Sequence, residues 1–588
     1  MNKVWIHPEF NAAKEKVFEE LRWNPKLSLI PDNSLRILIN KGITDASEIQ
    51  DLLIGGLEQL YDFKLMKGAR EAMVILIEAI RNRDLIVCMA DYDMDGIGAS
   101  SVVTKGFRML DANIQHHANN RFVEGYGLKP ESIDVILERF PDTKIILTVD
   151  NGISAFEGVR YAKEKGLIVI VTDHHEVSEE LPVADVIVNP KQKDCEYPFK
   201  ELCGAGIAFK LVIALALELG YPMDEFYDLV DIAALSTVGD LVPLVSENRI
   251  IVREGLKRVR EGKRSFFRKM KQIAEVDVPN EETFGFQYVP MINAHGRLAG
   301  EEIEGITKDD PRYMEIWYKG TTMPIVDTII SDDEVYQEAM INYLKNINAY
   351  RKEKTKEHDL LAAPLAKNQE HLPIIIIKHQ DFHPGLVGLV SGHLKEEYYR
   401  PTIVLSEREG LIHGSARSIN GFPIKEMFDK CSEFLDGYGG HAAAGGLNIK
   451  KGCYEGFVKR MNELAFEYLN EDLLTEKIKI DIDVTTNQID FQLIEELDFL
   501  RPYGMGFPKP ILALNDMNLI SKDVIGKNQN TTKILSYSDN EKTIETVIFG
   551  LPHYSQERLD QRKISILGYP SINTYGGVKV QFMGSRIK

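Results

Sequence analysis

Three short apolar runs in this 588-residue chain each end in acidic residues, and this pattern limits the possible folds more than any other feature. If the runs are parallel strands of one sheet, their acidic ends open into the crevice where α/β proteins bind ligands. Carboxylates gathered there repel one another unless a cation holds them together. The pattern therefore predicts a metal site with two ions, and chemistry on an oxyanion such as phosphate. The runs and the residues after them are 85–88 with Asp91, Asp93 and Asp95; 145–149 with Asp150; and 167–171 with Asp173, His174 and His175.

The first acidic end, DYDMDG, combines carboxylates with glycine. Asp93 and Asp95 lie two residues apart, so in extended backbone they would face the same side. Gly96 and Gly98 then allow a sharp turn into a helix whose N-terminus could hold phosphate. The same sequence is also common in loops that bind no metal, so the motif alone leaves both interpretations open.

The second and third acidic ends also have two interpretations each. Asp150, in TVDNGIS, either supplies a carboxylate to the site or only caps the following helix. In the triplet Asp173, His174 and His175, one imidazole would bind manganese, zinc or iron while its neighbour contacts substrate. A carboxylate could fix the tautomer of the ring. The alternative for either histidine alone is a structural role.

A fourth carboxylate, Asp240, comes from a different kind of element. It follows the apolar stretch 232–238, which is more typical of a buried helix than of a strand. The combination predicts a binuclear site built from Asp93, Asp95, a bridging Asp150, His174 and Asp240.

Length and composition agree with an enzyme of several domains. No apolar run reaches the length of a membrane span, and the first residues lack a cationic segment followed by a hydrophobic one, so we expect a cytoplasmic protein with no membrane contact. The five cysteines are scattered and lack zinc-binding spacing, which favours reduced thiols over disulfides.

The net charge of −19 by itself argues against a nucleic-acid partner. The segment 253–271, REGLKRVREGKRSFFRKMK, is an exception, with nine basic and two acidic residues around Phe266 and Phe267. It predicts either a groove lining that follows a phosphate backbone or, with equal weight, a solvated helix face.

The order of predicted elements divides the chain into five parts. Strand-like and helix-compatible stretches alternate in two regions, which predicts two α/β lobes around a central cleft. Short alternating runs in the last part predict a small antiparallel barrel. The predicted parts are a helical lead-in at 1–70, an α/β domain at 71–326, a long connecting helix at 327–370, a second α/β domain at 371–470 and the barrel at 471–588.

At the level of whole motifs, the chain resembles the RecJ single-strand-specific exonucleases of the DHH phosphoesterase superfamily. The matching motifs, in order, are DYDMDG, NRFVEGYGL, TVDNGIS, VTDHH, LCGAGIAFKL, STVGDLVPL, INAHGRL, FHPGLVGLVSGHL, GSARSI, GGHAAAGG and PYGMGFPKP. The resemblance implies that 71–326 is a DHH catalytic domain, 371–470 a DHHA1-type domain and 471–588 an oligonucleotide-binding (OB) fold.

The resemblance also implies roles for the matched residues. At the reacting centre, the matched positions are Asp93 and Asp95 as metal ligands, Asp150 as the bridging carboxylate, His174 and Asp240 as further ligands, His175 beside the scissile phosphate, and Asp91 near the metals with a catalytic role. Guanidinium groups suit phosphate, so the matched arginines are chemically reasonable ligands of a 5′ phosphate. The predicted substrate-binding set is Arg297, Ser415 and Arg417 for that phosphate, Asn120 and Arg121 for the DNA backbone, and Asn293 and His441.

Three positions depart from the family pattern. Met89 stands where some superfamily members have a histidine ligand, so one ion would be bound more by water or Asp91. His295 replaces a small residue and places a donor beside Arg297, and Asn151 replaces a frequent cysteine. We expect only the first to affect metal preference.

The resemblance implies a 5′-to-3′ exonuclease that releases mononucleotides from single-stranded DNA with a 5′ phosphate, in DNA repair and recombination. Its cofactors would be two divalent ions, Mn²⁺ first and Mg²⁺ second. The chain would act as a monomer, with a helicase or a single-strand-binding protein as partners. Two alternatives remain open: a DHH phosphodiesterase of short oligonucleotides or cyclic dinucleotides, and a catalytically silent scaffold that binds single strands.

Overall fold

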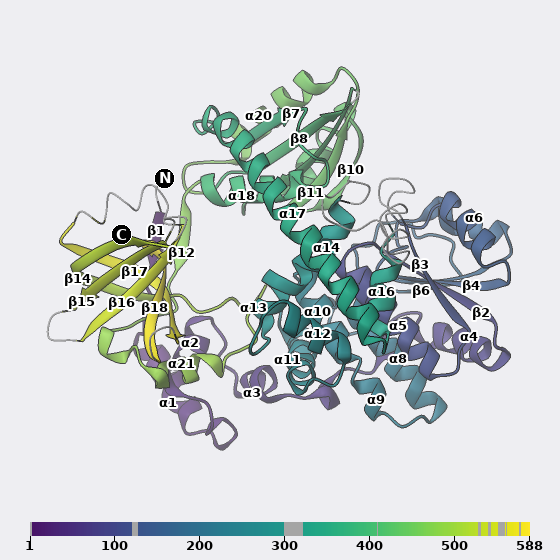
Figure 1. Cartoon of the computed structure of the whole chain (residues 1–588), viewed down its shortest axis with the longest axis horizontal. Coiled ribbons are helices and arrows are strands. Elements are labelled where there is room, and N and C mark those ends of the chain that lie inside the picture. Colours follow the sequence, from purple (N-terminus) through teal and green to yellow (C-terminus); the bar gives the residue numbers. More distant parts are fainter. Residues whose placement is uncertain are drawn as a thin grey trace. The chain divides into compact units, whose positions relative to one another are not determined.

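The computed structural model divides into two compact units (Figure 1). The first unit contains residues 6–290, 319–341 and 479–588, and the second contains 1–5, 291–318 and 342–478. The residues described are 3–119, 127–298, 321–408, 410–526, 531–538, 542–550, 559, 561–574 and 578–588.

A five-stranded parallel sheet of order β3-β2-β4-β5-β6 forms the centre of the first unit's α/β region. The three apolar runs become the neighbouring strands β2, β4 and β5, so the predicted parallel sheet is confirmed. β3, with the sequence IQHHA, was not predicted, because two histidines interrupt its apolar pattern. The strands are β2 Leu85–Ala90, β3 Ile114–Ala118, β4 Thr143–Val149, β5 Ile168–Thr172 and β6 Val186–Val188.

Helices surround this sheet, and three of them, α5, α8 and α10, pack on one another beside the acidic strand ends. α10 confirms that the apolar stretch before Asp240 is a buried helix. The helices of the region are α4 Ala69–Asn82, α5 Met94–Met109, α6 Pro130–Arg139, α7 Phe156–Glu164, α8 Gly204–Leu219, α9 Asp224–Tyr227, α10 Val230–Gly239, α11 Ser246–Glu261, α12 Ser265–Ile273, α13 Glu281–Thr283, the π-helix η4 Phe284–Tyr288 and α16 Met323–Ile330.

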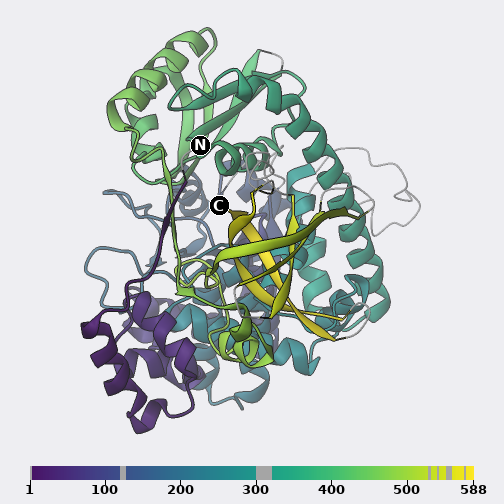
Figure 2. The same cartoon turned by 90° about the vertical axis from the view of Figure 1, so that its left-hand side faces the viewer.

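The C-terminal strands form a closed barrel, drawn in yellow in Figure 2. The order β14-β15-β16-β18-β17 closes because β14 also pairs with β17, and β13 adds a short parallel pairing. This closed five-stranded barrel confirms the predicted OB fold. The elements are β13 Ile482–Asp483, η6 Thr486–Gln488, α21 Phe491–Asp498, β14 Leu512–Ile525, β15 Thr531–Tyr537, β16 Thr543–Phe549, β17 Lys563–Asn573 and β18 Lys579–Ile587.

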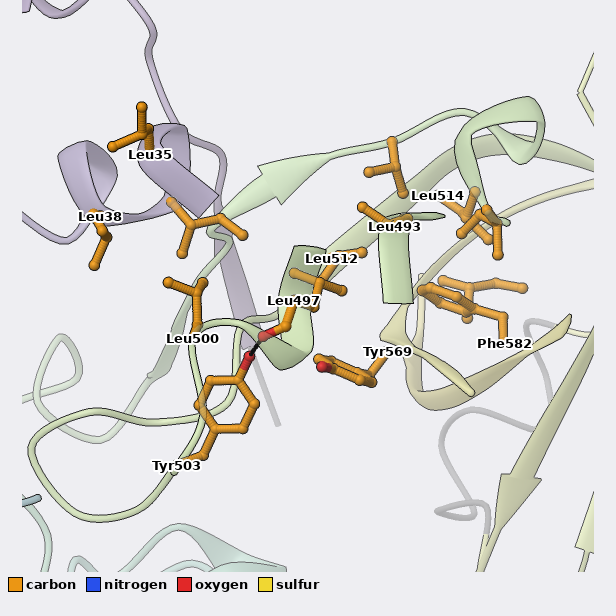
Figure 3. Close-up of a cluster of buried hydrophobic side chains, with 14 of the residues drawn as sticks. Leu35, Leu38, Leu493, Leu497, Leu500, Tyr503, Leu512, Leu514, Tyr569 and Phe582 are labelled. Carbon is orange, nitrogen blue, oxygen red and sulfur yellow. Dashed lines mark hydrogen bonds between the residues drawn. The ribbon is translucent and has the colours of Figure 1, made fainter. Parts of the chain in front are cut away.

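The N-terminal helices share one hydrophobic core with this barrel. Leu35 and Leu38 of α2 join the cluster that contains Leu497 and Leu500, as Figure 3 shows. The helical prediction for this segment is confirmed, but its packing partner lies more than 400 residues away in the sequence. The elements are α1 Ala12–Arg22, η1 Pro25–Leu27, α2 Asp32–Asn40, α3 Ala46–Ile54, η2 Leu57–Gln59 and η3 Phe63–Leu65.

The second unit contains a mixed sheet of order β10-β11-β9-β8-β7. Only β7 and β8 are parallel in it, and the glycine-rich run forms the antiparallel hairpin β10–β11. Its elements are β7 Ile375–His379, α18 Val387–Tyr398, β8 Thr402–Arg408, β9 Leu411–Arg417, α19 Ile424–Asp429, η5 Ser432–Phe434, β10 Leu435–His441, β11 Ala444–Ile449 and α20 Tyr454–Tyr468; β1 Lys3–Ile6 pairs with β12 Glu476–Lys479.

Among the described residues, two helices contain residues of both units. They are α14, Val289–Leu298, and α17, Glu334–Lys367, so a long helix is present where the sequence predicts a connection. The bounds of the five predicted parts and the cleft between the lobes stay predictions. Among the described residues, every helix is too short or too polar to cross a lipid bilayer.

Candidate metal centre

The loop after β2 places its carboxylates in two different positions. Asp93 is the N-cap of α5, and its Oδ1 accepts hydrogen bonds from the amides of Asp95 and Gly96 at 3.0 and 3.3 Å. Asp95 already lies in the first turn of α5. The expectation that the two side chains face one side of an extended backbone is therefore wrong, because the helix begins at Met94.

Asp95 is held by the N-terminus of another helix. The amides of Gly204 and Ala205, the first residues of α8, donate to its Oδ2 and Oδ1 at 2.6 and 2.9 Å. These donors were not predicted, because the sequence motif LCGAGIAFKL gives no sign of where its backbone points. Its two glycines near a helix start are the one signal that would have drawn attention to the segment.

Asp150 follows β4 in the left-handed region, with φ of +59°. The next helix, α7, begins only at Phe156 and its N-cap is Ala155, so the interpretation of Asp150 as a helix cap is wrong. Asn151 holds this loop, since its amide donates to the carbonyls of Met89 and Val149 at 3.1 and 3.0 Å. The loop directs the buried Asp150 carboxylate toward the ends of the neighbouring strands.

The two histidines after β5 differ in their surroundings. Asp173 accepts from the amides of Ile153, His174 and His175, and its Oδ1 lies 2.7 Å from Nδ1 of His175. Asp173 therefore fixes the His175 ring, as predicted for a neighbouring carboxylate. The side chain of His174 is 9% exposed, whereas that of His175 is 45% exposed.

Nε2 of His174 lies at the centre of the acidic cluster. It is 3.0 Å from Oδ1 of Asp150, 3.6 Å from Oδ2 of Asp95 and 3.7 Å from Oδ2 of Asp240, which caps the C-terminus of α10. Ligand atoms within 4.8 Å of one another form three groups: Asp91, Asp93 and Asp150; Asp95, His174 and Asp240; and Asp150, His174 and His175. All five predicted metal ligands, with Asp91 and His175, are thus brought together.

Burial and mutual repulsion raise the proton affinity of the carboxylates. The pKa of Asp150 is raised well above its usual range by burial and then by Asp95 and Asp93. Burial and the same two neighbours raise the pKa of Asp240, and burial followed by Asp95 raises that of Asp93. Carboxylates with raised pKa values in one cluster are typical of a site that binds a cation.

The histidine pKa values move in opposite directions. Burial lowers the pKa of His174, which favours the neutral imidazole that binds metals. The pKa of His175 rises to about 9, because its interactions with Asp173 outweigh the opposing effect of burial. Asp173 thus favours the protonated form of the His175 ring in the metal-free protein.

The donor set fits divalent cations. Asp150 Oδ1, His174 Nε2 and Asp240 Oδ2 are buried and make no hydrogen bond within the described part of the chain. Unsatisfied buried acceptors are costly, and cations bound by the ligand groups would satisfy all three. Carboxylate oxygen with imidazole nitrogen suits manganese.

Two of the departures from the family pattern pack as structural residues. Met89 lies in the hydrophobic cluster with Val87 and Val171, on one face of the sheet. His295 is buried, with Nδ1 2.9 Å from the hydroxyl of Tyr343 on α17. The predicted effect of Met89 on metal preference stays a prediction.

The basic run 253–271 is largely neutralised within the first unit. Phe266 and Phe267 are buried and offer no stacking surface. Arg258 pairs with Asp228 at 3.1 Å, and Arg264 pairs with Asp231 at 2.9 Å. Lys263, Arg268 and Lys269 also have acidic partners at 2.8 to 2.9 Å. These pairings favour the interpretation as a structural helix surface.

The predicted phosphate ligands lie in the second unit. Arg417 and Ser415 are two residues apart on β9, with Arg417 Nη1 3.1 Å from Ser415 Oγ. Burial, and then the charge of Arg297 on α14, lower the pKa of Arg417. Guanidinium groups that depress one another's pKa favour an anion between them. Arg351 of α17, which was not predicted, is similarly affected by Arg297.

The other predicted substrate residues give less information. Asn293 is half-buried on α14, and its Oδ1 makes no hydrogen bond in the described residues. His441 is exposed at the end of β10. Asn120 and Arg121 lie outside the described residues.

Comparisons with known proteins identify the family. The DHH family N-terminal domain matches residues 85–237, the DHHA1 domain matches 371–470 and the RecJ OB domain matches 480–585. Single-stranded-DNA-specific exonuclease RecJ of Bacillus subtilis is 34% identical over 92% of this chain, which spans 66% of that relative. The RecJ of Haemophilus influenzae is 32% identical, with 80% of this chain and 81% of the relative covered.

A solved structure supports the fold. The crystal structure of RecJ in complex with Mn²⁺ from Thermus thermophilus matches with a TM-score of 0.81 and 22% identity, covering 100% of this chain and 80% of that chain. Sequence and fold agree, and the chain belongs to the RecJ family of single-stranded-DNA-specific exonucleases.

Proposed function

We propose that this protein hydrolyses single-stranded DNA from a phosphorylated 5′ end and releases mononucleotides, using two divalent cations. The observation that carries the proposal is the position of Asp150, which belongs to one potential ligand group with Asp91 and Asp93, while its Oδ1 also lies 3.0 Å from Nε2 of His174, a member of a second group. A carboxylate shared in this way suits a bridge between two ions. Mn²⁺ ranks ahead of Mg²⁺ because His174 is among the ligands.

The protein side chains would divide the chemical work. Asp91, Asp93 and Asp150 would hold one cation, and Asp95, His174 and Asp240, with Asp150 shared between the two, would hold the other. Bound cations supply positive charge that polarises a phosphoryl oxygen and makes water more acidic. His175, whose side chain is half-exposed, would donate a hydrogen bond to the scissile phosphate. Asp173 orients that ring through its 2.7 Å contact.

The polarity of the reaction would come from the arginines of the second unit. Arg297 and Arg417, with Ser415, would hold the 5′ phosphate, since planar guanidinium groups bind phosphate through paired hydrogen bonds. The OB barrel would add affinity for the single strand. A helicase or a single-strand-binding protein as partner, a monomeric state, a cytoplasmic location and a role in repair and recombination stay predictions.

The test is degradation of long single-stranded DNA labelled at either end, with and without a 5′ phosphate, in Mn²⁺, Mg²⁺ or chelator. We expect metal-dependent release of mononucleotides from the 5′ end, with duplex spared. Cleavage of short oligonucleotides only would favour the alternative phosphodiesterase, and DNA binding without cleavage in any metal would favour the scaffold.

A matched pair of variants assigns the activity to Asp150. Asp150→Asn should reduce turnover by about 10³-fold or more while single-strand binding is retained. Asp111→Asn is the control, because Asp111 is exposed and has the same φ of +59°. Equal activity of the two variants would contradict the role proposed for Asp150.

A further inference from the structure

The first turn of α8 contacts two of the proposed metal ligands at once. One contact is the pair of hydrogen bonds from the amides of Gly204 and Ala205, which hold both carboxylate oxygens of Asp95. Donors at a helix N-terminus favour negative charge, so they stabilise this carboxylate in a single orientation. Both residues are buried, which leaves no water to compete for the same hydrogen bonds.

The second contact is steric and depends on the absence of a side chain at Gly204. A Cβ atom at this position would lie 2.6 Å from Cβ of Asp150 and 3.0 Å from its Cα and Cγ. Real Cβ atoms essentially never approach other atoms so closely, so either Asp150 or the helix would have to move. Gly206, two residues along the same helix, is less restricted, because the nearest neighbour of a Cβ atom there would be Cδ2 of Leu202 at 3.3 Å, the end of a flexible side chain that needs to shift only slightly.

The rest of α8 is anchored, so the helix cannot easily move to relieve such a clash. Nζ of Lys210 donates to Glu247 of α11 at 2.6 Å and to the carbonyl of Tyr61 at 2.5 Å. Lys210 and Glu247 are both buried, with side chains 4% and 1% exposed. A charged pair in this setting is costly to break, so it resists movement of the helix at Lys210, less than two turns from Gly204.

We infer that Gly204, together with the backbone amides of Gly204 and Ala205, is a positioning element that sets the separation of the Asp95 and Asp150 carboxylates, and with it the geometry of the two ions. Gly204 touches no substrate and acts only through these two ligands. The inference rests on the proposed two-ion function. Groups that orient metal ligands typically change metal affinity by about 10- to 100-fold when they are altered.

The experiment compares Gly204→Ala with Gly206→Ala in the full chain. Mn²⁺ is titrated into each variant and into the wild type, and calorimetry gives the affinities. Electron paramagnetic resonance detects the spin-coupled Mn²⁺ pair. We expect Gly204→Ala to weaken Mn²⁺ binding by about 10-fold or more and to lose the coupled signal. Gly206→Ala should keep both within about twofold of wild type.

The outcomes separate this inference from the proposed function. A wild type that shows no coupled Mn²⁺ pair contradicts the two-ion function itself. If the wild type shows the coupled pair and Gly204→Ala shows the same signal and affinity, the role inferred for Gly204 is overturned. The two-ion function is not affected by that result.

A second measurement covers the case in which Gly204→Ala folds poorly. Thermal unfolding in chelator is measured for Gly204→Ala in the wild type and in an Asp150→Gly background, where glycine accepts the positive φ. Because most of the clash is with the Asp150 side chain, the loss in Tm should shrink in that background. An equal loss in both backgrounds would show that the methyl group acts elsewhere.

Discussion

Two buried clusters of charged residues in the first unit differ in whether their buried polar atoms find hydrogen-bond partners within the protein. In the first, Glu247 accepts from Lys210 at 2.6 Å, from the Tyr197 hydroxyl at 2.6 Å and from the Tyr61 amide at 2.9 Å. In the second, the metal centre, carboxylates face one another, and three buried acceptor atoms make no hydrogen bond among the described residues: Asp150 Oδ1, His174 Nε2 and Asp240 Oδ2. A structural cluster is complete without a ligand, whereas a binding site is completed by one.

The largest effect should come from breaking the structural cluster. Glu247→Gln leaves the buried Lys210 ammonium without its ionic partner, so we expect a loss of about 3 to 5 kcal/mol in the free energy of unfolding. Urea denaturation in chelator measures this loss. A change below about 1 kcal/mol would mean that the pair does not stabilise the fold.

The metal centre should respond in the opposite direction. Asp150→Asn removes one charge from a set of repelling carboxylates, so the metal-free protein should become more stable by about 1 to 2 kcal/mol while it loses activity. The same denaturation experiment measures this gain, with Asp111→Asn as the control at equal φ. A metal-free Asp150→Asn protein that is less stable than wild type would contradict the proposed repulsion.

The pH dependence of metal stabilisation sharpens the comparison further. Asp93, Asp150 and Asp240 have folded-state pKa values above their unfolded values, so the metal-free folded state binds more protons than the unfolded state. The metal-free protein therefore loses stability as the pH rises from the unfolded toward the folded pKa values. Mn²⁺ replaces those protons and removes the penalty. The rise in Tm on adding Mn²⁺ should therefore grow from about pH 5 to about pH 8. If the rise in Tm on adding Mn²⁺ became smaller with increasing pH, the raised pKa values of these carboxyl groups would be contradicted.

The sequence predicts those features of the metal centre that depend on local pattern. Runs of buried β-branched residues ending in Asp91, Asp150 and Asp173 were enough to predict three strands with one ligand edge. The contact between Asp95 and the N-terminus of α8 could not be predicted, because it joins segments 109 residues apart through backbone amides.

Tertiary packing also decided the features that the sequence left open or did not indicate. Phe266 and Phe267 are core residues because α12 packs its apolar side inward, although the surrounding charge resembles a nucleic-acid surface. Leu35 of the N-terminal helices packs in the core of the C-terminal barrel, a contact that no local periodicity indicates.

The smallest effect should come from the basic run. Lys257 and Lys271 are exposed, and replacing both with alanine should change single-strand affinity by no more than about twofold, because we place no DNA groove there. Binding is measured over a range of salt concentrations. If the two lysines instead contacted two phosphates in a groove, the steepness of log affinity against log salt would be smaller by about 1.4 in the variant than in the wild type.

The central claim is that the acidic ends of β2, β4 and β5, with Asp240 of α10, form a two-ion site. Calorimetric titration of Mn²⁺ into the wild type and into Asp150→Asn at neutral pH tests this claim most directly. We predict two ions bound by the wild type and at most one bound tightly by Asp150→Asn, since the variant lacks the shared carboxylate. Equal stoichiometry and affinity in the two proteins would contradict the claim.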